Sequence, residues 1–537
     1  MQRPLTRQES RRLRRAFTIV CLTGLILACA RHGKDQGSVV HRRLEGEPKT
    51  LNALLITSDY DAQVLSMISR NLLDYDTQLN LGPGLADSVE PDASHLAYTV
   101  KLNAAARWED GTPVTADDLV VTIERLMDPS TPSLARRGFF EGLVRVEKVD
   151  SKTARVLFKE PYAGRRDAFN LQLLPAAQYR DGNLLTSPHN RQPLANGPYR
   201  LARWVPGREI ELVRNTQYWG EKAPAESVLF HLVTDSDAAF QSVLSGQLDD
   251  CRVTFEQKKK LDADPARRAR SVVWDELAYN YIGWNNRLPL FSDRRVRKAL
   301  TMLLDREGLV KSTLYGGLAR VANGPVPPGL WTYDATLAPW PHDPAAAQAL
   351  LAEAGFKKGA DGVLLRGKER FAFDLLLGAG SSTQRQMAEF TQQAYRKAGI
   401  EMTLRPMEWA VFSSKVDEGD YQACMLAWSL DPNPDLAPNF HSSQTPPAGL
   451  NSAFYRSAQA DALMDELKTT FDRDKAKELY RQLQRVIHED EPVSFLITPK
   501  VKWAVSTELT GVTTSPLGLF LTWPGGAGWA RAKKPVS

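Results

Sequence analysis

Two serines in the second half of the chain are the first candidates for chemistry. Ser381 and Ser382 follow a Gly-Ala-Gly run at residues 378–380, which superficially resembles the turn that carries a hydrolase nucleophile. That turn needs a glycine after the serine, and none is present here. A helix is predicted to begin directly after this point, and serine is a preferred capping residue. We therefore interpret one of these serines as a helix cap and assign no catalytic residue.

The histidines offer no local metal site. The eight histidines stand at positions 32, 41, 95, 189, 231, 342, 441 and 488, and no two are spaced as in H-E-x-x-H or H-x-H. The glycine motifs that cradle phosphates, G-x-G-x-x-G and G-x-x-x-x-G-K-[ST], are also absent. We expect no metal, no cofactor and no enzyme activity.

A tryptophan and an aspartate three residues apart form a third candidate. Trp428 and Asp431 stand in the sequence Trp-Ser-Leu-Asp, and Pro432 follows. A carboxylate is the partner that a desolvated ammonium needs, because burying an unpaired charge is costly. Aspartate before proline is also typical of a turn with a solvated side chain, and the local sequence alone favours that interpretation.

The chain is rich in tryptophan, with twelve residues. Broad aromatic walls suit pockets for varied side chains. Core packing is the commoner role of any one tryptophan, and we assign Trp219 and Trp284 to the core.

The elements that must position these residues alternate between strands and helices. Residues 95–102 alternate apolar and polar side chains, as a half-buried strand requires. Thr115 and Asp118 form a capping box at the start of a helix. Further helices are predicted over residues 344–354, 384–398 and 474–488, with a strand at 400–404. Strands and helices interleave throughout, so the fold class is α/β.

The first 28 residues are typical of an export signal. Six arginines precede an apolar run from residue 16 to residue 28. The run is too short to span a bilayer, which takes about 20 apolar residues. Cys29 follows Ala28 in an arrangement that resembles a lipobox, in which the cysteine is acylated and becomes the first mature residue, although Leu27 occupies a position where a small or β-branched residue is more usual. The alternative is an ordinary cleaved signal with an incidental cysteine.

The first 28 residues also account for the net charge of the chain. The chain holds 68 Lys+Arg and 63 Asp+Glu, a formal charge of +5. Residues 1–28 hold six arginines and one glutamate, also +5, so the mature chain is formally neutral. Neutrality argues against a nucleic-acid or polybasic membrane-binding role. The mature chain is too long for one core, so we expect at least two lobes.

Four cysteines are present, and two of them belong to the mature fold. Cys21 leaves with the signal and Cys29 would carry the lipid, which leaves Cys251 and Cys424. An exported pair could form a disulfide, but spacing alone does not establish one. Two separate buried thiols are favoured.

Several blocks follow one another in a set order over nearly all of the mature chain. They are Glu47-Pro48-Lys49-Thr50-Leu51-Asn52, the Trp-Glu-Asp-Gly-Thr-Pro block that starts at Trp108, Asn196-Gly197-Pro198-Tyr199, Arg214-Asn215, Tyr218-Trp219-Gly220, residues 284–306, and residues 323–329. Together they resemble the family 5 extracellular solute-binding proteins, which are the oligopeptide, dipeptide and nickel receptors of ABC importers.

The resemblance implies a periplasmic-binding-protein-like fold, in which two hinged α/β lobes close on a ligand between them. The resemblance places lobe I at 45–280 with 500–537 and lobe II at 281–499. The residues themselves predict a signal peptide at 1–28, a polar, lipid-anchored tether at 29–44 and an exported lipoprotein of the cell envelope or periplasm. Its partners would be a small solute, a membrane through the lipid and an ABC permease, and we expect a monomer.

The resemblance also suggests site residues. In peptide-binding members, a Trp-x-x-Asp on a loop of lobe II holds the ligand's α-ammonium through the aspartate, and residues 428–431 resemble it. Asp431 and Trp428 are therefore candidate ligand-binding residues, and Trp409 lies where relatives place a pocket aromatic. Some oligopeptide receptors use an arginine three residues before this tryptophan to take a peptide carboxylate. Met425 stands there in this chain, which leaves room for longer peptides or for a ligand that is not a peptide.

Three functions follow in order of support. The first is a receptor that delivers peptides to an ABC permease by hinge closure. The second is a receptor of the same fold for another solute, such as a nickel chelate, an opine or an oligosaccharide, and a free-amine requirement on the ligand would separate the two. The third is an envelope hydrolase, against which the missing motifs argue.

Overall fold

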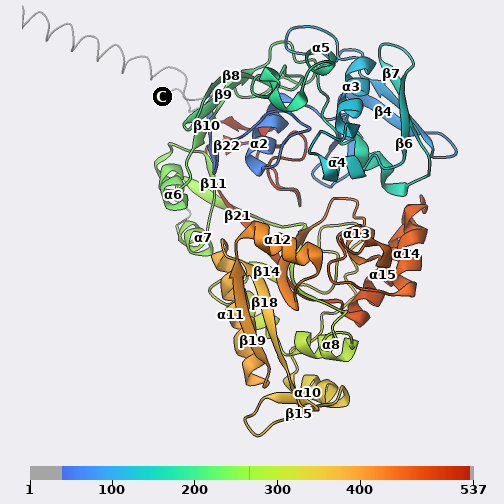
Figure 1. Ribbon diagram of the computed structural model, residues 1–537. Helices are drawn as coiled ribbons and strands as arrows, with labels where there is room; N and C mark the ends of the chain where they lie inside the picture. The colour runs from blue at the N-terminus through green and yellow to red at the C-terminus, as the bar shows by residue number, and fades with distance from the viewer. Residues whose placement is uncertain (1–38, 265, 533–537) are drawn as a thin grey trace, which may run out of the picture.

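The computed structural model describes residues 39–264 and 266–532. Figure 1 shows two bodies, one above the other, with strand β21 (Val493–Ser506) in the region where they meet. The upper body is lobe I and the lower body is lobe II. The arrangement is the two-lobed α/β architecture that the sequence predicts.

Lobe I is built on two four-stranded sheets. In the first, β1 (Val39–Leu44) pairs in parallel with β10 (Ser227–Leu232), which continues antiparallel to β9 (Glu209–Arg214) and β8 (Tyr199–Val205). The second is antiparallel throughout, in the order β4 (Ala86–Pro91), β5 (Ala97–Leu102), β7 (Thr153–Phe158) and β6 (Leu143–Lys148). The lobe I core draws its buried side chains from residues 40–230 and again from residues 501–529.

Strand β1 corrects the predicted tether, because residues 39–44 belong to the sheet of lobe I. Val40, Arg42 and Arg43 are all buried. Arg42 lies 3.4 Å from the carboxylate of Asp250, and its guanidinium lies 3.8 Å from the centre of the Phe520 ring. The charges that suggested a solvated segment are thus paired inside the lobe.

Helices and short segments complete lobe I. The predicted capping box is confirmed, since Asp118 Oδ2 accepts the backbone N–H of Thr115 at 2.7 Å at the start of α3. The helices are α2 (Asp59–Ile68), α3 (Ala116–Met127), α4 (Leu134–Gly138), η1 (Ala163–Phe169), α5 (Ala176–Tyr179), η2 (Leu184–Thr186), η3 (Pro188–Asn190), α6 (Ser236–Ser245), α7 (Phe255–Asp262) and η5 (Gly525–Gly528). The short strands are β2 (Leu73–Tyr75), β3 (Leu81–Pro83), β11 (Asp250–Arg252), β22 (Leu509–Thr510) and β23 (Ala530–Arg531).

Lobe II is centred on a mixed sheet. Strand β18 (Ala372–Gly378) runs parallel to both β19 (Glu401–Met407) and β20 (Ala423–Ser429), and β20 is antiparallel to β13 (Ala278–Trp284). The helices are α8 (Arg294–Met302), α9 (Arg306–Lys311), α10 (Pro344–Glu353), α11 (Ser382–Lys397), α12 (Trp409–Glu418), α13 (Ala437–Phe440), η4 (Ser442–Gln444), α14 (Ala458–Lys468) and α15 (Arg473–Asp490). The remaining strands are β14 (Ala319–Val321), β15 (Phe356–Lys358), β16 (Leu364–Arg366) and β17 (Glu369–Arg370).

The predicted helices of lobe II are confirmed, with boundaries that differ by a few residues. The side chain of Ser381 caps α11 by accepting the backbone N–H of Gln384 at 3.2 Å. This contact supports the interpretation of Ser381 as a cap rather than a nucleophile.

Three strands carry the chain between the lobes. Residues 493–497 of β21 pair with β13 in lobe II, and residues 500–506 of the same strand pair with β12 (Ala269–Asp275) in lobe I. Strands β12 and β13 follow each other directly and make the same crossing. A sheet that belongs to both lobes is the hinge that the closure of a two-lobed receptor requires.

The two remaining cysteines lie in different lobes. Cys251 in β11 and Cys424 in β20 are free and buried, which confirms the expectation of two separate thiols. Burial raises the pKa of each thiol to about 12. Within the part of the chain that the structure describes, no helix has the length and apolar character needed to cross a bilayer.

Candidate ligand-binding site

Asp431 lies just beyond the end of β20. The preceding residue, Leu430, is buried and donates its backbone N–H to the carbonyl of Leu277 at 2.8 Å, which fixes the chain at this point. The side chain of Asp431 is exposed. Among residues 39–264 and 266–532, no hydrogen-bond or ion-pair partner approaches its carboxylate. Among the described residues, Asp431 thus presents a carboxylate without a partner two residues beyond the end of β20.

The charges that act on Asp431 come from lobe I. Burial raises the pKa of Asp431, the carboxylate of Asp167 raises it further, and the guanidinium of Arg136 opposes both effects. The side chain is exposed, and the protein atoms around it still desolvate the carboxylate in part. Arg136 belongs to α4, and burial lowers its own pKa. Asp431 therefore faces lobe I across the space between the lobes.

Asp167 is the lobe I counterpart of Asp431. It lies in η1, where Asn433 Nδ2 donates to its Oδ2 at 3.0 Å and the Tyr75 hydroxyl donates to its Oδ1. The pKa of Asp167 is raised, mainly by burial, although both hydrogen bonds oppose the rise. The charge of Asp167 disfavours the ionisation of Asp431, and a cation bound near both carboxylates would offset that effect.

The lobes already touch on one side of this space. The Tyr162 hydroxyl of lobe I donates to Asp435 Oδ2 of lobe II at 3.1 Å, and the rings of His95 and Phe471 stack with centroids 3.6 Å apart. A cavity of about 510 Å³ lies beside these contacts, and Pro432, the neighbour of Asp431, is part of its wall.

A larger cavity, of about 870 Å³, lies between the lobes on the side of α7 and α12. Lobe I contributes residues 252–256 to its wall, and the hinge contributes residues 499–502. Lobe II contributes Trp409 and segments near the start of α11 and the end of β20. Trp409 is the first residue of α12, and 61% of its surface is exposed. The structure therefore places one of the three predicted ligand contacts in the wall of this cavity.

The two faces of β20 serve different purposes. Trp428 stands opposite Tyr279 on β13 and packs partly buried against an apolar cluster of lobe II. Ala427 points the other way, is exposed, and lines the larger cavity. Met425, the position where some receptors carry an arginine, is fully buried in the lobe II core. Trp409 thus lines the larger cavity, whereas Trp428 lines neither of the two interlobe cavities.

One edge of β20 is open near the cavity. The strand pairs with β13 along all seven residues, but β18 pairs with it only at Ala423 and Cys424. Gln384 Nε2 donates a hydrogen bond to the carbonyl oxygen of Met425 at 2.6 Å. Beyond that point, no described strand pairs with the second edge of residues 427–429. An extended peptide can add to such an edge through main-chain hydrogen bonds.

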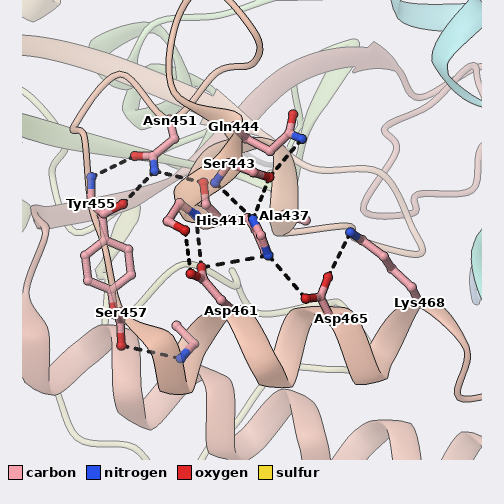
Figure 2. Close-up of polar contacts among 12 residues, drawn as sticks. Ala437, His441, Ser443, Gln444, Asn451, Tyr455, Ser457, Asp461, Asp465 and Lys468 are labelled. Atoms are coloured by element: carbon pink, nitrogen blue, oxygen red, sulfur yellow. Dashed lines mark hydrogen bonds and ion pairs between the residues drawn. The ribbon is translucent and has the colours of Figure 1, made fainter.

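A separate polar cluster around His441 has the residue types of a hydrolase triad. Figure 2 shows His441 between Ser443 and two carboxylates of α14, Asp461 and Asp465. Ser443 Oγ lies 2.7 Å from His441 Nδ1, but the carboxylates are 3.9 and 3.5 Å from Nε2, beyond hydrogen-bond range. The backbone N–H of Ser443 donates to the same Nδ1 at 3.1 Å. The imidazole therefore caps η4, and none of these residues lines either interlobe cavity.

No metal site accompanies these cavities. Across the described residues, no three histidine, cysteine, aspartate or glutamate side chains gather closely enough to hold a metal ion. The site residues that sequence reasoning missed are charged and come from distant segments, namely Arg136, Asp167, Arg252 and Lys502. No local motif marks them, because only the tertiary fold brings them together.

Residues 80–451 match the model of the bacterial extracellular solute-binding proteins, family 5. The chain belongs to this family. It is 30% identical over 488 residues to the oligopeptide-binding protein AppA of Bacillus subtilis (strain 168), with 88% of each chain covered. It is 29% identical over 466 residues to the glutathione-binding protein GsiB of Pectobacterium atrosepticum, with 84% of this chain and 87% of that protein covered.

Solved structures of family 5 proteins have the same fold. The chain is similar to AppA from Bacillus subtilis in complex with a nonapeptide, at 29% identity and a TM-score of 0.75, with 93% of this chain and 99% of AppA covered. It also has the fold of NikZ from Campylobacter jejuni in complex with Ni(L-His), at 24% identity and a TM-score of 0.77, with 92% and 100% covered. The chain is thus an extracellular solute-binding protein, and the expectation that it is not an enzyme agrees with membership of a family of binding proteins.

Proposed function

We propose that this protein is a lipid-anchored receptor that captures peptides between its lobes and delivers them to an ABC import permease. The observation that carries the proposal is the free carboxylate of Asp431, which faces Asp167 across the interlobe space. The α-ammonium of a peptide would pair with Asp431 and relieve the repulsion between the two carboxylates. A buried ammonium requires such a partner, because an unpaired buried charge is costly.

The surroundings of Asp431 support a peptide as the ligand. The open edge of residues 427–429 offers main-chain hydrogen bonds to an extended chain whose amino terminus lies at Asp431. The larger cavity provides space for side chains, and Trp409 gives it an apolar wall that tolerates different residues. AppA, a relative at 29% identity, is described in complex with a nonapeptide.

Hinge closure follows from where the ligand groups lie. Asp431 and Trp409 belong to lobe II, and Asp167 and Arg136 belong to lobe I. A ligand stabilises the closed form only by what it gains there beyond its contacts in the open form. A peptide held by lobe II forms its contacts with lobe I only when the lobes close, so it stabilises the closed form. The permease then receives a closed receptor with its peptide bound.

Other solutes remain alternatives within the same fold. GsiB, a relative at 29% identity, is a glutathione-binding protein, and glutathione carries an α-ammonium that Asp431 could hold. A nickel chelate, an opine or an oligosaccharide would not share a requirement for a free peptide amine. The dependence of binding on that amine therefore separates the peptide proposal from these last three solutes, and identification of the bound ligand separates it from glutathione.

Native mass spectrometry of the mature protein without its lipid, followed by identification of any released ligand, tests the proposal. A series of short peptides supports a peptide receptor and gives the range of lengths. A single non-peptide mass overturns the proposal in favour of another solute. For an empty protein, a thermal-shift screen with peptides replaces the first test, because a ligand that binds only the native state raises the melting temperature.

The affinity for amine-bearing peptides is expected to fall as the solution becomes acidic. The pKa of Asp431 in the free protein lies above its usual value, and a bound ammonium would lower it. Binding is therefore strongest above the free-state pKa and weakens as the pH falls through that value, with proton release on binding in this window. Isothermal titration in buffers of different ionisation enthalpy measures both effects. An Asp431→Asn variant should show a flatter pH profile, and an unchanged profile would contradict this account.

Replacing Cys29 with serine is expected to release the protein from the membrane. Cys29 lies outside the residues that the structure describes, so the lipid anchor rests on the sequence alone. A single acyl chain binds membranes only marginally, so stable anchoring requires more than one lipid chain. Fractionation of cells that produce wild type and Cys29→Ser, with immunoblotting, provides the measurement. A variant that stays in the membrane fraction rules out anchoring through Cys29.

A further inference from the structure

The lobe I wall of the larger cavity holds two neighbouring cations. Arg252 ends β11 and Lys502 lies on the adjacent strand β21, and the backbone N–H of Val253 donates to the carbonyl of Lys502 at 3.1 Å. Both residues line the cavity. Arg252 is exposed and Lys502 is half-buried.

Neither cation has a close anionic partner among the described residues. Lys500, two positions earlier on β21, pairs with Asp275 at 3.5 Å, whereas no carboxylate lies within 4.0 Å of Arg252 or Lys502. Glu276 is the carboxylate whose charge acts on Lys502. The charged residues of the cavity wall are three cations, Arg252, Lys500 and Lys502, and two carboxylates, Glu256 and Glu276, which gives a formal charge of +1. Burial lowers the pKa of Lys502, and the charge of Arg252 lowers it further. The wall therefore has an excess of positive charge facing a solvent-filled space.

We propose that Arg252 and Lys502 bind a carboxylate of the ligand, and that the receptor thereby selects peptides with a free carboxyl terminus. The inference rests on the proposed peptide function and adds the recognition of the second end of the ligand. A guanidinium can donate two parallel hydrogen bonds to a carboxylate, and an ammonium adds a point charge beside it. Some receptors bind a peptide carboxylate through an arginine at the position of Met425, but Met425 is buried in the lobe II core and carries no charge. In this chain, Arg252 and Lys502 would take that role from the opposite lobe.

The placement of the charges couples recognition to closure. Asp431 belongs to lobe II, whereas Arg252 and Lys502 belong to the lobe I side of the hinge. A peptide with two free ends would bridge the lobes, and each end would add to the stability of the closed form.

The experiment uses an equimolar tetrapeptide library without aspartate or glutamate, prepared with free, acetylated, amidated and doubly blocked ends. Calorimetric titration of the wild type should show a preference for the free acid over the amide on the order of ten- to a hundredfold. The Arg252→Met/Lys502→Met variant should lose this preference and keep its affinity for the amide. Lys258→Met/Arg270→Met is the matched control, because it removes the same charge from side chains that do not line the cavity.

Three other results overturn the inference, and they have different meanings. Equal affinity of the wild type for acid and amide, or equal weakening of both forms in the Arg252→Met/Lys502→Met variant, excludes the carboxylate site while peptide binding itself stands. Failure of all four library forms to bind the wild type overturns the peptide function and this site together. Thermal melting of each variant verifies folding, and the single variants Arg252→Met and Lys502→Met provide a second test if the double variant unfolds.

Discussion

An Asp431→Asn variant should fold normally and bind amine-bearing peptides on the order of 10²–10³ times more weakly than the wild type. The reason is that the bound ammonium would keep its burial but lose its charged partner, which costs about 3–5 kcal/mol. The fold should tolerate the change, because the carboxylate is exposed and contacts no described residue. Calorimetric titration with peptides that carry a free amine, together with thermal melting, gives both quantities.

Asp420→Asn is the matched control for this prediction. It also removes one carboxylate from lobe II, but Asp420 is exposed and its partner is Lys415 at the surface. Its affinity for peptides should equal that of the wild type. If Asp431→Asn retains full affinity, Asp431 is outside the site, and the same measurement on Asp167→Asn then shows whether the lobe I carboxylate holds the ammonium.

An Arg42→Met variant is expected to lose about 3–5 kcal/mol of unfolding free energy. Arg42 and Asp250 are both fully buried, and the guanidinium also lies over the rings of Phe230 and Trp529 at 5.0 Å each. Methionine keeps the apolar stem but leaves Asp250 with only the Trp503 indole N–H, at 3.1 Å, as a described polar partner. Urea unfolding followed by tryptophan fluorescence measures the change.

Neutralising the partner should restore much of this loss. In Arg42→Met/Asp250→Asn, the buried negative charge is gone and the amide oxygen can still accept from the indole of Trp503. If the single and double variants are equally unstable, the loss comes from packing around the guanidinium rather than from the unpaired carboxylate. If Arg42→Met has the same unfolding free energy as the wild type, the buried pair in β1 contributes little to the stability of lobe I.

Local pattern was sufficient to predict much of the secondary structure. The capping box of Thr115 and Asp118 and the cap at Ser381 depend on neighbouring residues, so spacing alone identifies them. The resemblance carried by the ordered sequence blocks then predicted the two lobes. Strand β1 escaped prediction because Arg42 pairs with Asp250, 208 positions away, and Arg43 donates to the carbonyl of Val233, 190 positions away. No local window contains these partners.

The candidate ligand-binding residues were less accessible to sequence reasoning for the same reason. Asp431 could be chosen only through the resemblance, since aspartate before proline is equally typical of a turn. The direction of Met425 into the core and of Ala427 into the cavity depends on the strand partners of β20. Arg136, and the pair formed by Arg252 and Lys502, acquire their surroundings only when distant segments assemble.

The lobe I core includes Val501, Trp503 and Trp529 together with residues near the amino end of the fold, such as Val40. Trp529 follows all of lobe II in the chain, so it is synthesised after that lobe is complete. Lobe II, whose sequence is continuous between the two halves of lobe I, can therefore assemble while lobe I still lacks part of its interior. Synthesis order thus makes lobe I the last lobe to complete its core, and the nascent chain exposes unfinished apolar surface until its final segment has been made.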